Sequence, residues 1–210
     1  MRLALRWPVV LFDLDGTLLD TIPLIRESHR HAVRTVLGHD LPDDVLESGI
    51  GTPLLEQMQI FSPEHAQELF DTYRTWNHAN TARLLAGFDG IDEVLLALEG
   101  AGARLGVVTS KMRDAVDLAF RVRPLPVVFD AVVTYDDTAT HKPGPEPIRH
   151  ALELVGAAPE DAVYVGDATA DARAAAAAGV AFVGVAWGVA EPAALAEVGA
   201  GVVARTPAEL

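Results

Sequence analysis

The stretch that decides the fold is Val9-Val10-Leu11-Phe12-Asp13-Leu14-Asp15-Gly16-Thr17. Its first four residues form an apolar run of strand length, which is typical of a strand buried on both faces of a sheet. Two carboxylates, Asp13 and Asp15, follow directly, and Gly16 then lets the chain turn sharply close to a ligand. The pattern predicts a buried strand that ends in two acidic side chains able to face one cavity.

Further apolar runs of strand length recur along the chain, and helical patterns stand between most of them. Strands that alternate with helices indicate a parallel sheet. We therefore predict an α/β fold, a doubly wound, Rossmann-like parallel sheet. The further strands are expected at residues 105–108, 132–134, 162–165 and 180–185, and the helices at 91–99, 113–120, 146–155 and 171–178.

The interval from residue 19 to residue 87 interrupts this alternation. It contains helical patterns at 22–37, 53–61 and 63–76 but no strand run. In such sheets ligands bind beyond the carboxyl ends of the strands. We therefore predict a core domain of residues 1–18 and 88–210, with a small helical cap of residues 19–87 inserted after the first strand as a lid.

Composition limits the classes of partner. The 210 residues carry a net charge of −14 and no basic run, which argues against nucleic acid. The chain has no cysteine, which excludes thiol nucleophiles and thiolate metal sites. The first residues show no signal peptide, so a cytoplasmic location is expected. The uncharged stretch 174–190 is divided by Gly179, so no membrane span is expected.

Hydroxyl and lysine side chains follow two later elements. Thr109 and Ser110 end the strand at 105–108 and can donate hydrogen bonds to a phosphoryl oxygen, although such a pair is often only a helix cap. Lys142 lies in His-Lys-Pro-Gly-Pro-Glu-Pro, where three prolines restrict the backbone. The chain has only two lysines, Lys111 and Lys142, and both lie beside these expected phosphate sites.

A second acidic pair, Asp167 and Asp171, follows the strand at 162–165. These carboxylates can converge with Asp13 on one cation, although Asp171 is also a plausible helix cap. Carboxylates with water and a substrate phosphate suit Mg²⁺, whereas the absence of Cys and of a closely spaced His pair in the core argues against zinc. A carboxylate such as Asp13 can attack phosphorus, and a second acid can protonate the leaving oxygen.

These four segments, in this order, resemble the haloacid dehalogenase superfamily of phosphohydrolases over essentially the whole chain. The resemblance implies that Asp13 is the nucleophile and Asp15 the general acid and base. It implies that Thr109 binds the phosphoryl group and that Lys142 steadies it. Mg²⁺ would be held by the Asp13 carboxylate, the Asp15 carbonyl and Asp167, with Asp171 as support.

Within that superfamily the chain is similar to capped bacterial pyrophosphatases and to phosphoglycolate phosphatases. The similarity lies in residues 49–53, in Tyr-Arg-Thr-Trp-Asn-His at 73–78 and in residues 184–188. It implies a small phosphorylated metabolite or pyrophosphate as substrate, and a monomer or homodimer. The residues expected to contact this substrate are Ser110, Gly51, Arg74, Asn77 and His78, although the cap residues could equally form a solvated helix face.

Three alternatives share parts of this pattern. A dehalogenase would need no acid on a leaving oxygen, so Asp15 weighs against it. A phosphosugar mutase would use Asp15 to return the phosphoryl group to another hydroxyl, and sequence separates it poorly from a hydrolase. A phospho-acceptor signalling domain is disfavoured by the inserted cap and by the tandem Asp13 and Asp15.

Overall fold

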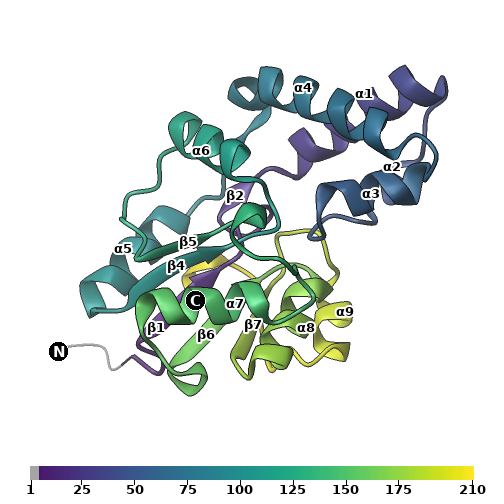
Figure 1. Ribbon diagram of the computed structural model, residues 1–210. Coiled ribbons are helices and arrows are strands. Elements are labelled where there is room, and N and C mark those ends of the chain that lie inside the picture. The colour runs from purple at the N-terminus through teal and green to yellow at the C-terminus, as the bar shows by residue number, and fades with distance from the viewer. Residues whose placement is uncertain (1–4) are drawn as a thin grey trace.

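A sheet of six parallel strands forms the centre of the computed structural model, which describes residues 5–210 (Figure 1). The strand order is β5-β4-β1-β6-β7-β8, which confirms the predicted α/β fold. The first four residues of the expected core lie outside the described residues. The strands are β1 (Val9–Phe12), β4 (Arg104–Val108), β5 (Ala131–Val133), β6 (Ala162–Gly166), β7 (Ala181–Val185) and β8 (Val202–Ala204).

Helices cover both faces of this sheet. α5 (Ile91–Ala101) and α6 (Arg113–Val122) pack on one face, where Val10 and Phe12 of β1 point. α7 (Glu146–Val155) and α8 (Thr169–Ala178) pack on the other. Alternate residues of a strand point to opposite faces, and burying each such side chain contributes roughly 1.5–3 kcal/mol. The apolar run of β1 therefore anchors both layers.

A group of four helices is inserted after β1, and we call this insertion the cap (Figure 1). The sequence patterns missed the short second helix, and they ended the last one too early. That helix continues because Asn77 and Thr81, polar residues on its buried side, form hydrogen bonds within the cap. The cap helices are α1 (Ile22–Leu37), α2 (Asp43–Glu47), α3 (Leu54–Phe61) and α4 (Ala66–Leu84).

The cap is joined to the core through a two-stranded antiparallel ribbon. Its strands, β2 (Leu19–Asp20) and β3 (Ala86–Gly87), have only two residues each. The expectation of an interval without strands is thus wrong at its two ends, because a two-residue strand leaves no periodic pattern. The ribbon brings both ends of the insertion together, and the domain limits at residues 18 and 88 stay a prediction.

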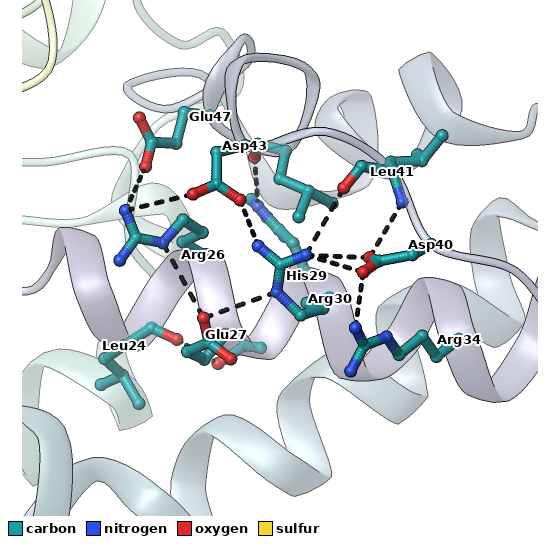
Figure 2. A network of polar contacts seen from close by, with 12 residues as sticks. Leu24, Arg26, Glu27, His29, Arg30, Arg34, Asp40, Leu41, Asp43 and Glu47 are labelled. Atoms are coloured by element: carbon teal, nitrogen blue, oxygen red, sulfur yellow. Dashed lines mark hydrogen bonds and ion pairs between the residues drawn. The ribbon is translucent and has the colours of Figure 1, made fainter.

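An ion network ties α1 to the segment that contains α2 (Figure 2). Nη1 of Arg30 donates to both carboxylate oxygens of Asp40, at 2.9 and 3.0 Å, and Nη2 contacts Asp43. Nη1 of Arg26 donates to Glu47 at 3.0 Å. Beside this network, Nδ1 of the buried His29 ring lies 2.6 Å from the Leu46 carbonyl oxygen.

The remaining elements complete the carboxyl-terminal edge. β8 and α9 (Pro192–Glu197) were not predicted, because neither has the length of a clear periodic pattern. The uncharged stretch at 174–190 divides at Gly179, as expected, into the end of α8 and β7. Within residues 5–210, none of the helices combines the length and the apolar character needed to cross a bilayer.

Candidate functional site

Three neighbouring strands end beneath the cap. Asp13 follows β1, Thr109 follows β4 and Asp167 follows β6. The Asp13 amide donates to the Val165 carbonyl at 2.8 Å, and the Thr109 amide donates to the Val133 carbonyl at 2.9 Å. The sheet's own hydrogen bonds therefore continue to the residues that carry the polar side chains. All three side chains are buried.

Lys142 reaches the same place from the loop before α7. Its Nζ donates to Asp13 Oδ1 at 2.9 Å, to Asp171 Oδ1 at 2.7 Å and to the Tyr164 hydroxyl at 3.0 Å. The Lys142 side chain is 1% exposed. A buried ammonium is costly unless it is paired and hydrogen-bonded, and here each of its three N–H groups has an acceptor.

Asp167 is oriented by donors on both oxygens. Thr17 Oγ1 donates to Oδ1 at 2.8 Å, and the Val189 amide donates to Oδ2 at 2.7 Å. Two glycines permit this close packing. A Cβ on Gly16, where φ is +82°, would lie 2.3 Å from Asp167 Oδ2, and one on Gly188 would lie 2.2 Å from the Asp167 Cβ. Any side chain at either glycine would push Asp167 out of place.

Asp13, Asp167 and Asp171 form what we call the carboxylate cluster, with oxygens within 4.8 Å of one another. Burial raises the pKa of Asp13 well above its ordinary value, which the charge of Lys142 opposes and the other two carboxylates reinforce. Burial and the charge of Asp171 raise the pKa of Asp167 to about 7. Both shifts mean that, without a further cation beside them, burial favours the protonated form of these carboxyl groups.

The cluster fits the Mg²⁺ that the sequence predicts. Within residues 5–210, Lys142 is the one cation paired with these three carboxylates, so two negative charges would be uncompensated with all three ionised. A divalent cation carries that charge, and the donors are all oxygen atoms, which Mg²⁺ prefers. Both Asp171 oxygens already accept hydrogen bonds, from Lys142 Nζ and from the Ala168 amide at 2.9 Å. One of these donors is the charged Lys142 ammonium, which suits Asp171 to support the site and to begin α8. Among the residues that the structure describes, Asp167 accepts only from neutral donors, the Thr17 hydroxyl and the Val189 amide, so its charge is available, with that of Asp13, to hold the ion.

Asp15 lies on the cavity side of the cluster and pairs with Lys111. The Lys111 Nζ donates to Asp15 Oδ1 at 2.8 Å, and both side chains are largely buried. Together with Asp13, Thr109 and Lys142 they line one cavity between the core and the cap. Of the chain's two lysines, Lys142 therefore contacts Asp13 and Lys111 contacts Asp15.

The cap touches the site through Gly51. Ser110 Oγ donates to the Gly51 carbonyl at 2.9 Å, and a Cβ on Gly51 would lie 2.8 Å from the Ala168 side chain. Gly51 has φ of +99°, a conformation that glycine adopts without strain. Through Gly51 the cap therefore contacts two core loops, the one after β4 and the one after β6.

The other three expected cap residues line the cavity from α4 but already have partners. Arg74 contacts the Asp114 carboxylate of α6, and His78 Nε2 lies 3.8 Å from the same carboxylate. Asn77 is 4% exposed, and its amide donates to Ser28 Oγ at 2.9 Å and to the Tyr73 hydroxyl at 3.3 Å. Arg74 and His78 thus bridge cap and core, whereas Asn77 fixes α4 against α1.

Sequence reasoning missed Thr17, Tyr164 and the Val189 amide. Thr17 stands in the opening motif, and a hydroxyl four residues after Asp13 was a usable signal. Tyr164 lies inside an apolar strand run, where an aromatic residue is read as core. The partners of its two shorter hydrogen bonds, Lys142 and Val108, are 22 and 56 residues away in the chain, and Asp171, at 3.3 Å, is seven residues away in the next helix. No local pattern contains that information.

Comparison with known proteins gives a consistent result. Residues 10–185 match the family of haloacid dehalogenase-like hydrolases. The chain is 40% identical to "Pyrophosphatase PpaX" of Bacillus velezensis over 87% of this chain and 84% of that protein, and 36% identical to "Pyrophosphatase PpaX" of Anoxybacillus flavithermus over 85% and 83%.

A solved structure extends this result to the fold. A protein of Haemophilus somnus 129pt, described as a predicted phosphoglycolate phosphatase, superposes with a TM-score of 0.89 at 22% identity, covering 98% of this chain and 96% of that one. At that identity the likeness concerns the fold alone. The family match and the two curated relatives confirm the resemblance drawn from the four motifs. The chain belongs to the haloacid dehalogenase-like hydrolases.

Proposed function

We propose that this protein is a Mg²⁺-dependent phosphohydrolase that forms an aspartyl-phosphate on Asp13. The observation that carries the proposal is the buried carboxylate cluster with Lys142 as its paired cation. Burial on this scale is expensive for charged groups, so it favours a functional role over a structural one. Bound Mg²⁺ would offset the charge of the carboxylates and of the phosphoryl oxygens.

The side chains can divide the hydrolysis into two steps. An Asp13 oxygen attacks phosphorus, the bond to the leaving oxygen breaks, and Asp15 supplies that oxygen with a proton. Asp15 then takes a proton from water as the water attacks the aspartyl-phosphate and releases phosphate and the free Asp13 carboxylate. Thr109 would donate to the phosphoryl group, and Lys142 would hold Asp13 in line.

Pyrophosphate is the substrate that we favour. The cavity volume is about 70 Å³, small beside the roughly 300–1,000 Å³ of drug-sized pockets. Lys111 and Arg74 line it in addition to Lys142, so a second anionic group on the substrate would meet positive charge. The two relatives named pyrophosphatases point the same way. Phosphoglycolate, with its carboxylate, meets the same requirements.

A phosphate-release assay with and without Mg²⁺ tests the activity. The panel is pyrophosphate, phosphoglycolate and a sugar phosphate, and the variants are Asp13→Asn and, as a matched control, Asp117→Asn on the exposed side of α6. We expect release that requires Mg²⁺, that Asp13→Asn abolishes and that Asp117→Asn leaves unchanged. No release from any substrate would refute the proposal, and isomerisation of the sugar phosphate without release would favour the mutase.

A second pair of variants tests the cap. We expect Arg74→Met to raise the KM for pyrophosphate, because a cation that meets the second phosphoryl group is lost. Asp114→Asn frees Arg74 from its carboxylate partner and should lower that KM. Para-nitrophenyl phosphate, whose leaving group carries no second anionic group in the bound substrate, serves as the comparison. Equal changes in KM for both substrates would show that Arg74 does not bind the second anionic group.

A further inference from the structure

Tyr164 lies under the site and takes no part in the chemistry described above. It belongs to β6, next to β1, and pairs in register with Leu11. Its side chain is fully buried, and its hydroxyl donates to the Val108 carbonyl at 2.7 Å. The side chain therefore spans from β6 past β1 to the end of β4.

The same hydroxyl oxygen accepts a hydrogen bond from Lys142 Nζ at 3.0 Å. The other two donors of that ammonium go to Asp13 and Asp171. The Tyr164 hydroxyl is thus the neutral member of a cage of three acceptors. Burial and the charge of Asp171 raise the pKa of Tyr164 well above its ordinary value, so the hydroxyl stays protonated and can donate to Val108.

Packing does not explain this hydroxyl. A phenylalanine would fill the same space, whereas a buried hydroxyl costs free energy unless it is hydrogen-bonded. The hydroxyl also lies 3.3 Å from Asp171 Oδ1, and its two shorter bonds both lead to the site. One fixes the ammonium that contacts Asp13, and the other fixes the backbone of Val108, whose next residue is Thr109. Tyr164 therefore links the ammonium beside Asp13 to the strand end that is followed by Thr109.

We infer that Tyr164 is a positioning residue that acts through Lys142, holding its ammonium in register with Asp13 and Thr109. This inference rests on the proposed function. Without the hydroxyl, one N–H of Lys142 would lack its acceptor and the ammonium would be free to shift within the cluster. A shift of this kind affects the transition state more than it affects substrate affinity.

The test is the isosteric variant Tyr164→Phe, with Tyr135→Phe as matched control. Tyr135 stacks on His141, beside Lys142 in the chain, with ring centroids 4.0 Å apart. We expect Tyr164→Phe to lower kcat about tenfold, as for loss of one hydrogen bond to a charged group, with KM unchanged. Tyr135→Phe should keep both constants. A wild-type kcat in Tyr164→Phe, or a rise in KM alone, would overturn the inference.

A double-mutant cycle with Lys142→Met separates positioning from general structural support. If Tyr164 acts through Lys142, the tenfold effect of Tyr164→Phe disappears in the Lys142→Met background. The same tenfold effect in both backgrounds would contradict the inference. If the wild type releases no phosphate, the proposed function fails. The double-mutant cycle is then measured on the free energy of unfolding instead of on kcat. Additivity there would overturn the link between the two residues.

Discussion

Two polar networks of this protein differ in how far water reaches them. In the core, Lys142 and its acceptors are at most 3% exposed. In the cap, Arg30 and its partners range from 16% to 60% exposed. Removing water strengthens each contact but makes every unpaired charge costly. The buried core network can therefore alter the reactivity of its own groups. The exposed cap network serves to hold α1 against the segment that contains α2.

Core and cap also differ in how they accommodate a buried titratable group. Burial raises the pKa of Asp167 to about 7 in the core, while it lowers the pKa of His29 to about 4 inside the cap. In both cases the neutral form is favoured, because burial disfavours charge. The cap satisfies its buried residue by leaving it neutral. The core pairs its carboxylates with Lys142. With the carboxylates ionised, an excess of negative charge remains, which a bound cation can compensate.

The largest effect is expected for Lys142→Met. Removing one partner of a buried ion pair costs about 3–5 kcal/mol, and loss of a charge beside the reacting group lowers turnover by roughly 100- to 1000-fold. Urea unfolding and phosphate release measure the two effects. Arg34→Met, which removes an exposed cation of the cap, is the control and should change neither by much. Similar losses of stability and turnover in Lys142→Met and Arg34→Met would show that the two networks do not differ in this way.

His29 should give the cap a distinct pH dependence. Its folded pKa of about 4 lies below the unfolded value of about 6.5. The unfolded state therefore binds the proton first, and stability falls as the pH drops from about 6.5 to about 4, by about 3 kcal/mol in total. Urea unfolding across this range, in wild type and His29→Gln, isolates the contribution. The control variant His39→Gln, at an exposed position, should keep the wild-type dependence of unfolding free energy on pH. If His29→Gln kept it as well, His29 would not be the source of that dependence.

Metal removal should act on the core alone. Mg²⁺ at 100 times its dissociation constant should stabilise the protein by about 2.7 kcal/mol, and EDTA should reverse that gain. Thermal unfolding measures the shift in Tm. Asp167→Asn should lose the shift, and Arg30→Met in the cap should keep it. Retention of the full shift in Asp167→Asn would mean that the ion binds elsewhere.

The smallest effect is expected for Arg30→Met itself. The pairs of Arg30 with Asp40 and Asp43 are partly exposed, so their loss should cost about 1 kcal/mol, with turnover unchanged. Urea unfolding at low salt and at 1 M NaCl tests the cause, because salt screens exposed pairs. A cost that is the same at both salt concentrations would indicate lost packing of the arginine stem instead.

The success of sequence reasoning followed the range of the interactions involved. β1 and α1 were predicted residue by residue, because an apolar run or a helical period is local and Gly38, in a left-handed conformation, ends α1. The four core motifs were found because parallel strands place their carboxyl ends along one edge. The partners of Tyr164 and of Arg74 were not found, because each comes from a distant segment. Whether Arg74, Asn77 and His78 contact substrate stays a prediction.

The ribbon of β2 and β3 also bears on how this enzyme family could diversify. Leu19 pairs with Gly87 and Asp20 with Ala86, so the chain leaves the core and returns to it at one point. Because Asp13, Thr109, Lys142 and Asp167 all lie outside this insertion, on the loops of the sheet, another helical segment could replace it and leave these residues on the same core loops. If the cap contacts the substrate as predicted, part of the substrate range would be encoded in a stretch of the gene that can be separated from the core motifs. Grafting a relative's cap at these two pairs would be a practical route to new substrates.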